Sequence, residues 1–372
     1  MRADGGTAVR ARQRLAVLAL LLGWAAAAGS AAPASRWSAA WAAAMQPLEG
    51  AARVPDAWLT GATVRQFVRV TAAGRRVRLR LSNAFGTAPL ALVGVHVARA
   101  DAVHPTGAIA AASDRPVLFD GRPDVVIPPG AEWLSDPVDL PVAPLATVAL
   151  SLRLAAAPAE QTGHIASHAT SFFAPGDRLA APDMAGAATA EHWLALAGVE
   201  VDEAPGGVVA ALGDSITDGS HSVTDANGRW PDILADALAT RLAHPPAVLN
   251  LGIGGNRVLL DGVGPNMLAR LERDVLSQPG LTTVVLLEGI NDIGTLTRAG
   301  PVGAQEHAAL VLRLIGAYAQ TVARAPARGD GDRRHAVAVR GCRLLPPGPR
   351  RGGRPDRGQP LDSRRLPLRR GG

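Results

Sequence analysis

After residue 206 the chain alternates between short apolar runs and longer stretches in which apolar residues have helical spacing. The apolar runs cover 207–212, 247–251 and 282–287, and the helical stretches cover 230–242, 267–276 and 305–324. Strands that alternate with helices of this length form parallel crossover units, because parallel neighbours need a long connection. The pattern therefore predicts an α/β domain over residues 207–327, with a parallel sheet and helices on both of its faces.

Each of these apolar runs is followed by glycine and polar residues. The three turns read Gly213-Asp-Ser215, Asn250-Leu-Gly-Ile-Gly-Gly-Asn-Arg257 and Glu288-Gly-Ile-Asn-Asp292. The carboxyl ends of parallel strands meet at one edge of the sheet, where open α/β sheets bind their ligands. We therefore expect the Ser215 hydroxyl, the Gly255 amide and the Asn291 side chain to converge at this edge.

This set of groups suits acyl transfer from an ester. A serine is the nucleophile, and N–H donors stabilise the oxyanion that forms after attack on the carbonyl. Gly255 lacks a Cβ, so its N–H can approach closely, and Asn291 can donate through its side-chain amide. The N–H of Ser215 would be the third donor.

Each motif also has a simpler interpretation. Ser215 could lie on an ordinary turn, and Asn291 with Asp292 could cap the turn that follows. The glycines at 252–255 could bind a phosphate, although the loop lacks the lysine and the spacing of the known phosphate-binding motifs. Three such motifs at successive junctions favour a functional site.

Together the three motifs resemble blocks I, II and III of the SGNH, or GDSL, hydrolase family. The segments Arg229-Trp-Pro231 and Leu81-Ser-Asn-Ala-Phe-Gly86 also resemble a secreted subgroup that carries an N-terminal β-domain. The resemblance implies a three-layer, flavodoxin-like α/β fold, with Ser215 as nucleophile and Gly255 and Asn291 as oxyanion donors. It also implies that neither a metal nor an organic cofactor takes part.

The fourth block of that family is an Asp-x-x-His that supplies the base and the acid that orients it. Asp332-Arg-Arg-His335 has this spacing, but it follows the third motif by only about forty residues and lies where a strand should begin. His221 is a weaker candidate, because a base must reach the hydroxyl from the opposite side. A serine hydrolase that lacks one triad member keeps only roughly 10³ to 10⁴ over the uncatalysed rate. A catalytically impaired chain therefore stays open as an alternative.

The carboxyl-terminal residues 328–372 are predicted to be a basic, disordered tail. From Val322 onward the chain contains 14 Arg and four Asp, whereas the residues before it contain 24 Arg and 28 acidic residues. Since the body is mildly acidic, no nucleic-acid partner is expected. Beyond a strand at 336–339 the tail has too few large apolar residues to offset its ordering entropy. This abrupt change indicates that the reading frame is altered near residues 325–331, before the Asp-x-x-His block.

The region at 33–202 has the pattern of an all-β sandwich or jelly-roll domain. Its candidate strands, separated by Gly and Pro turns, are 63–70, 75–82, 91–97, 125–127 and 147–154. The first two alternate, so each is expected to bury one face and expose the other to solvent. We interpret the row Arg76, Arg78 and Arg80 as that solvated face, with a glycan or anionic ligand as the alternative.

Two histidines in this region, His164 and His168, are four residues apart. No Asp, Glu or Cys lies close enough in the sequence to complete the usual ligand set of a metal. We therefore interpret both as surface or loop histidines. The single cysteine, Cys342, permits no internal disulfide.

The first 32 residues resemble a secretory signal peptide. Arginines at 10, 12 and 14 precede an apolar run at 15–28 and small residues at 29–32. The run is too short for a comfortable transmembrane helix. The mature chain is therefore expected to be secreted or periplasmic, without stable membrane insertion after cleavage, and an uncleaved anchor is the alternative.

These observations predict a secreted serine ester hydrolase of the acylhydrolase or acetylesterase type. The expected substrate is a small acyl ester, above all an acylated carbohydrate, and the sequence does not fix an oligomeric state. One alternative is a lipase or arylesterase that acts on lipid or aryl esters. The other is a glycan-binding homologue that lacks the catalytic histidine.

Overall fold

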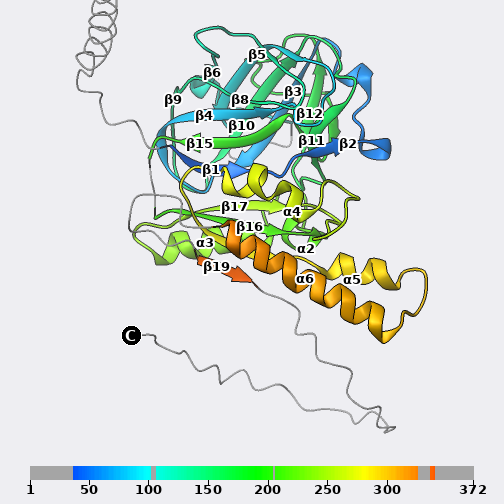
Figure 1. Cartoon of the computed structure of the whole chain (residues 1–372). Helices are drawn as coiled ribbons and strands as arrows, with labels where there is room; N and C mark the ends of the chain where they lie inside the picture. The colour runs from blue at the N-terminus through cyan, green and yellow to red at the C-terminus, as the bar shows by residue number, and fades with distance from the viewer. Residues whose placement is uncertain (1–36, 102–105, 204–205, 326–335, 340–372) are drawn as a thin grey trace, which may run out of the picture. The chain divides into compact units, whose positions relative to one another are not determined.

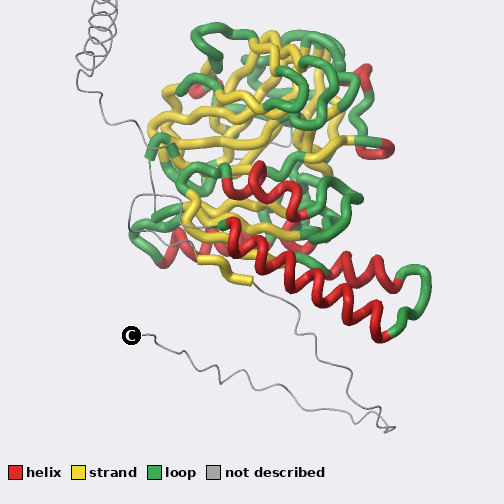
Figure 2. The backbone as a smooth tube through the Cα atoms, viewed as in Figure 1, coloured by secondary structure: helices red, strands yellow, loops and turns green. Residues whose placement is uncertain are grey.

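The computed structural model of this chain describes residues 37–101, 106–203 and 206–325, and the backbone of a strand at 336–339 (Figure 1, Figure 2). All of these residues belong to one compact unit that extends to Gly341. The expected signal peptide at 1–32 and most of the expected tail at 328–372 lie outside the described residues. No helix in the described part of the chain is both long and apolar enough to cross a membrane.

The amino-terminal part contains three antiparallel sheets. The first has the order β1 (Ser38–Ala42), β15 (Leu196–Val201), β4 (Gly74–Ser82) and β8 (Glu132–Leu134), with β9 (Val138–Val142) also paired to β4. The second has the order β13 (Ala188–Ala190), β12 (Ser171–Pro175), β3 (Ala62–Arg69), β10 (Thr147–Leu154), β5 (Leu90–Arg99) and β6 (Arg115–Pro116), with β7 (Val125–Ile127) also paired to β5. The third has the order β14 (His192–Leu194), β11 (Gln161–Ile165) and β2 (Gln46–Leu48).

The first two sheets enclose one apolar core. Val77, Leu79 and Leu81 of β4 are fully buried in the same hydrophobic cluster as Leu150 and Leu152 of β10. Two sheets that share a core in this way form a β-sandwich. This confirms the fold class expected for the β-rich region. Three short 3₁₀ helices lie in its loops, at Gly50–Ala52, Asp56–Trp58 and Ala111–Ser113.

The arginine row on β4 lies on the opposite face from this core. Arg78 is directly across from Glu200 of β15, and its side chain pairs with that carboxylate at 2.6 Å. Arg80 pairs with the other oxygen of Glu200 at 2.6 Å, and Arg76 pairs with Asp202 at 2.8 Å. Cross-strand carboxylates thus neutralise the row, as neighbours on one sheet face commonly do. This leaves little free positive charge there for an anionic ligand.

The expectation that the strand at 63–70 exposes one face is wrong. Arg65 of β3 is 0% exposed, and its guanidinium donates to the Ser151 hydroxyl and to the carbonyls of Gly107, Arg178 and Leu179. A guanidinium can be buried when several acceptors satisfy its donors. Sequence alternation could not show these acceptors, because Ser151 lies on the neighbouring strand β10 and the three carbonyls come from loops that cover the outer face of the sheet.

The carboxyl-terminal part contains a parallel sheet with helices on both faces. The strand order is β17 (Ala247–Gly252), β16 (Val208–Gly213), β18 (Leu281–Leu287) and β19 (Ala336–Val339). The helical elements are α2 (Ser215–Asp218), α3 (Trp230–Arg241), α4 (Met267–Arg270), the π-helical η4 (Leu271–Leu276), α5 (Ile290–Thr297) and α6 (Ala304–Arg324).

Alternation along the strands explains the layers. Val209, Val248 and Val285 form one cluster with Ala235 and Leu238 of α3. The opposite side chains of the same strands enter the main core, which also contains Leu271 and Val275 of η4 and Leu310 and Leu314 of α6. This is the three-layer α/β arrangement that the sequence predicts, and β19 has the predicted bounds.

The two parts of the chain are held together by backbone contacts as well as by a shared core. Ala39 of β1 donates its N–H to the Pro279 carbonyl at 2.9 Å. The Thr71 hydroxyl accepts from the Val248 N–H at 2.9 Å and lies within hydrogen-bond distance of the Ala40 and Val248 carbonyls. The division into domains at 33–202 and 207–327 stays a prediction.

Replacing Thr71 by Val tests this junction. The substitution keeps the shape of the side chain but leaves the buried Val248 N–H without its acceptor, and an unsatisfied buried donor costs about 1–3 kcal/mol. We expect the free energy of unfolding, measured by urea denaturation, to fall by about that amount. Thr240→Val is the matched control, because Thr240 is exposed on α3 and bonds only within its own helix. Equal losses in the two variants would contradict the prediction.

Candidate active site

Ser215 lies where β16 ends and α2 begins. A Cβ on Gly213 would collide with the Thr217 side chain and the Leu287 carbonyl, so the strand can turn this tightly only at a glycine. The Asp214 carboxylate caps α2 by accepting from the Ile216 N–H at 3.0 Å. Ser215 is half-buried, and within the described residues its hydroxyl and its N–H make no hydrogen bond. Both groups are therefore available to a bound substrate.

Gly255 and Asn291 are brought together at the neighbouring junctions. Gly255 has φ +74°, a conformation that favours glycine. The Asn291 side-chain amide donates to the carbonyl of Asn256, the next residue in the loop, at 2.9 Å. One N–H of that amide is used in this bond and the other is left for a ligand. Among the described residues, no acceptor takes the Gly255 N–H.

The turn that carries Ser215 contacts the glycine-rich loop at residues 252–257, called the glycine loop below. The Asp218 carboxylate, at the end of α2, accepts from the Gly254 N–H at 2.8 Å. A Cβ on Gly252 would collide with the α2 backbone at Asp218, so this loop lies directly against the helix. The structure therefore places Ser215, Gly255 and Asn291 at one edge of the sheet, as the sequence predicts, although their catalytic roles stay predictions.

A fully buried arginine, which sequence reasoning missed, joins the strand ends. Arg270 donates to the carbonyls of Gly213 at 3.0 Å and Leu251 at 2.8 Å, and to the Asn256 side chain at 2.9 Å. These acceptors belong to β16, β17 and the glycine loop. Arg270 also lies 3.5 Å from Asp274. The available signal was a charged residue within an otherwise apolar helical face, between Met267 and Leu271.

Glu288 lies beside this arginine, 3.6 Å from its guanidinium. Its side chain is 0% exposed, and within the described chain neither carboxylate oxygen has a hydrogen-bond partner. Burial raises the pKa of Glu288 to about 7, with smaller increases from Asp214 and Asp292, although the Arg270 charge opposes the shift. The protonated form of Glu288 is therefore favoured below about pH 7.

Asp292, the last residue of the third motif, holds the backbone that follows the glycine loop. Its carboxylate accepts from the Val258 N–H at 2.8 Å and from the Leu259 N–H at 3.0 Å. Asp292 is buried. It thus acts on the loop across 34 residues of sequence rather than as a simple cap of the next turn.

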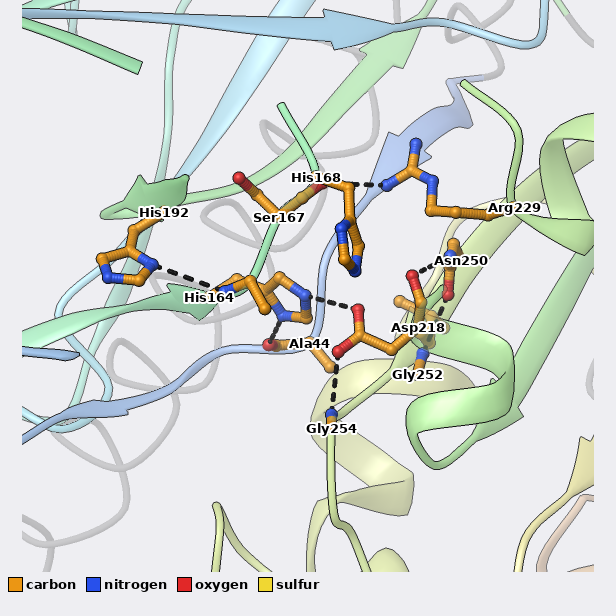
Figure 3. A network of polar contacts seen from close by, with 12 residues as sticks. Ala44, His164, Ser167, His168, His192, Asp218, Arg229, Asn250, Gly252 and Gly254 are labelled. Atoms are coloured by element: carbon orange, nitrogen blue, oxygen red, sulfur yellow. Dashed lines mark hydrogen bonds and ion pairs between the residues drawn. The ribbon is translucent and has the colours of Figure 1, made fainter. Parts of the chain in front are cut away.

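The interpretation of His164 as a surface or loop histidine is wrong. His164 lies on β11 with 2% of its surface exposed, and Figure 3 shows its ring between Asp218 and the Ala44 carbonyl. Its Nε2 is 2.9 Å from Asp218 Oδ1, and its Nδ1 is 2.9 Å from the Ala44 oxygen. Local spacing could not reveal this pair, because its partners come from distant segments. His168 does lie in a loop, at φ 49°, and no group of three or more metal-ligating side chains occurs among the described residues.

The sequence candidates for the base and its acid, His335 and Asp332, lie outside the described residues. The strand that follows them starts at Ala336, which pairs with Thr283 near the beginning of β18 and not at its carboxyl end. His221 is exposed on the loop after α2. These three assignments and the altered reading frame stay predictions.

Glu288→Gln tests the buried carboxyl through the pH dependence of stability. Folding raises the pKa of Glu288 from 4.5 to about 7. The stability linked to this proton is therefore fully present below pH 4.5 and is lost as the pH rises towards 7. At about 1.4 kcal/mol per pKa unit, the wild-type free energy of unfolding should decline by about 3 kcal/mol across this window relative to Glu288→Gln. Urea denaturation from pH 4 to 8 measures the difference. Glu49→Gln, at an exposed position, should keep the wild-type slope, and a parallel profile in Glu288→Gln would contradict the prediction.

Comparison with known proteins agrees with this geometry. Residues 211–367 match the GDSL-like lipase/acylhydrolase family, and this range includes all three junctions. No curated protein matches the chain significantly.

Three solved structures show weaker likenesses. AlinE4, an SGNH-hydrolase family esterase, is 21% identical with a TM-score of 0.26 and covers 37% of this chain, and this chain spans only 58% of AlinE4. A family two carbohydrate esterase from Cellvibrio japonicus is 13% identical over 79% of this chain and 80% of its own, with a TM-score of 0.24. One from Clostridium thermocellum in complex with cellohexaose is 13% identical over 72% and 82%, with a TM-score of 0.22. These scores are too low to bear on function. The match of residues 211–367 to the GDSL-like lipase/acylhydrolase family agrees with the parallel sheet and the three junctions, so this part of the chain is similar to that family.

Proposed function

We propose that this chain is an ester hydrolase with Ser215 as its nucleophile. The observation that carries the proposal is the set of three N–H donors, on Ser215, Gly255 and Asn291, that have hydrogen-bonding capacity left at the carboxyl edge of the sheet. Ser215 Oγ would attack the acyl carbonyl, and the donors would stabilise the resulting oxyanion, each by about 3–4 kcal/mol. The match of residues 211–367 to the GDSL-like lipase/acylhydrolase family supports the same reaction.

The reaction also needs a base. The Ser215 proton would pass to this base, collapse of the tetrahedral intermediate would release the alcohol with that proton, and water would then hydrolyse the acyl-enzyme. Asp332 and His335 have the sequence spacing of such a pair, but Ala336, the residue after His335, pairs with Thr283 near the start of β18, away from the carboxyl edge that carries Ser215. We therefore assign the base to no residue that the structure describes. His164 does not suit this role, because both of its ring nitrogens already have partners.

We further propose a secreted or periplasmic protein that removes small acyl groups from carbohydrate. This part rests on the arginine-led apolar run at 1–32 and on the resemblance of the β-rich region to the subgroup with an N-terminal β-domain. The β-sandwich fold is compatible with it. A glycan-binding homologue without hydrolytic activity is the competing outcome.

A second candidate substrate is an ester with a larger apolar acyl group or an aryl group. Large apolar side chains are exposed beside each of the three junctions: Ile216 next to Ser215, Ile290 next to Asn291, and Leu260 and Val263 in the loop after Gly255, with 46–54% of their surface accessible. Exposed apolar side chains gathered at a site commonly mark the surface that receives an apolar ligand. This observation favours lipid or aryl esters over acetate esters.

Hydrolysis of p-nitrophenyl acetate by Ser215→Ala tests the reaction. Loss of the nucleophile should lower kcat by roughly 10³-fold or more, because only the oxyanion donors and binding would remain. Ser220→Ala is the matched control, since Ser220 is an exposed serine on the same loop, and should keep the wild-type rate. Equal rates for wild type and Ser215→Ala would refute the hydrolase and leave the glycan-binding alternative.

Acyl-chain preference tests the second candidate. Val263 lies 3.4 Å from the position of a Cβ on Gly255, so Val263→Ser should remove apolar contact near the oxyanion donors. We expect kcat/KM for p-nitrophenyl octanoate to fall about 10-fold while that for the acetate changes little, as expected for the loss of a small apolar contact. Val223→Ser, at a position 73% exposed on another loop, is the control. An unchanged octanoate-to-acetate ratio in Val263→Ser would favour the small-acyl substrate.

A further inference from the structure

We propose that His164 is a positioning residue for the glycine loop at 252–257, which it holds in place through Asp218. The β-rich part of the chain would thereby set the geometry of the Gly255 donor. This inference rests on the proposed function, because the loop matters for catalysis only if Ser215 attacks an ester. The contact itself is a property of the fold and can be tested separately.

The Asp218 carboxylate has a different partner on each oxygen. Its Oδ1 faces His164 Nε2 at 2.9 Å, and its Oδ2 accepts from the Gly254 N–H at 2.8 Å (Figure 3). The Asn250 side chain donates to the Asp218 carbonyl at 3.3 Å, and its own oxygen accepts from the Gly252 N–H at 3.1 Å. One aspartate therefore joins the turn after Ser215 to the glycine loop on two sides.

The partners of His164 fix its protonation state. Its Nδ1 faces the Ala44 carbonyl, which can only accept, so Nδ1 must carry a proton. Its Nε2 faces the Asp218 carboxylate, which accepts a hydrogen bond best when Nε2 also carries a proton. The charged imidazolium thus donates to both neighbours, and it has no free lone pair with which to act as a general base.

The surroundings of this ion pair include further charged or titratable groups. Burial lowers the pKa of His164, but the Asp218 charge and hydrogen bond and the Ala44 carbonyl outweigh it, so the pKa is raised overall. Arg229, before α3, opposes the positive charge, and so does His192 of β14 whenever it is protonated. The Trp193 ring packs at 5.6 Å from the imidazole. Since the folded-state pKa is raised, the pair is complete at low pH and is lost as pH rises through that pKa.

Loss of His164 would leave one Asp218 oxygen without its partner in a buried environment. The carboxylate could then rotate away from the Gly254 N–H, and the adjacent Gly255 N–H would lose its fixed direction. Small displacements of a group that acts in the transition state lower kcat by up to about 100-fold. Ground-state binding depends less on this donor, so KM should change little.

The experiment compares His164→Phe with His164→Gln in the full chain. Phenylalanine fills the space without any donor, whereas the glutamine amide can still donate to Asp218 but carries no charge. His96→Gln is the matched control, because His96 forms a second histidine–aspartate pair, with Asp114 at 2.8 Å, on β5. The readouts are kcat and KM for p-nitrophenyl acetate from pH 5 to 9, and hydrogen–deuterium exchange of the peptide that contains 252–257.

His164→Phe should lower kcat by roughly 10- to 100-fold with KM within about threefold, and should speed exchange in 252–257. His164→Gln should restore most of kcat near neutral pH and should lack the decline in kcat that the wild type shows as pH rises through the His164 pKa. His96→Gln should leave kcat and exchange unchanged. Wild-type kcat, pH profile and exchange in both His164 variants would overturn the proposal.

Two outcomes are kept apart by this design. If the wild type shows no Ser215-dependent hydrolysis, the proposed function fails, while exchange at 252–257 still decides whether His164 holds the loop. If His164→Phe does not fold, the pH profile of His164→Gln decides, because a merely structural histidine replaced by a hydrogen-bonding residue would leave that profile unchanged.

Discussion

The buried guanidinium of Arg270 is the constraint on which the site depends. It binds the main-chain carbonyls of Gly213 and Leu251, at the ends of two neighbouring strands, and the Asn256 side chain, so the end of β16 and the segment 251–256 share one rigid donor. The Arg270 side chain is 0% exposed, and a charge buried to this extent is tolerated only when its donors are satisfied and an opposite charge is near. Asp274, whose carboxylate lies 3.5 Å from the guanidinium, meets the second condition.

Around this arginine, the polar residues of the motifs mainly position backbone. Asp214 caps the helix that carries Ser215, Asp218 holds Gly254, and Asp292 holds the two N–H groups that follow the loop. Backbone N–H groups make good oxyanion donors only when their direction is fixed before the reaction. The carboxylates therefore fix the direction of the groups that would touch the substrate.

Much of this arrangement could be predicted from the sequence. The strands at 125–127, 147–154 and 336–339 were predicted with their observed bounds, because short apolar runs between Gly and Pro turns leave few alternatives. The convergence of Ser215, Gly255 and Asn291 followed from parallel topology alone. The burial of Arg65, His164 and Arg270 could not be predicted in the same way, because each is a polar residue whose partners come from distant segments. The periodicity of a sequence indicates which side chains face inward but not which groups they contact.

The hydroxyl of Thr71 has one more consequence, which concerns the open side of the parallel sheet. β17 is an edge strand, and the Val248 N–H that points away from the sheet bonds to this hydroxyl rather than to another strand. Unpaired edges invite pairing with a second chain and hence aggregation. The β-sandwich thus covers this edge. If recombination transferred the α/β part alone, the β17 edge would be exposed. Such a part would need another segment to cover β17, because an exposed edge strand favours self-association.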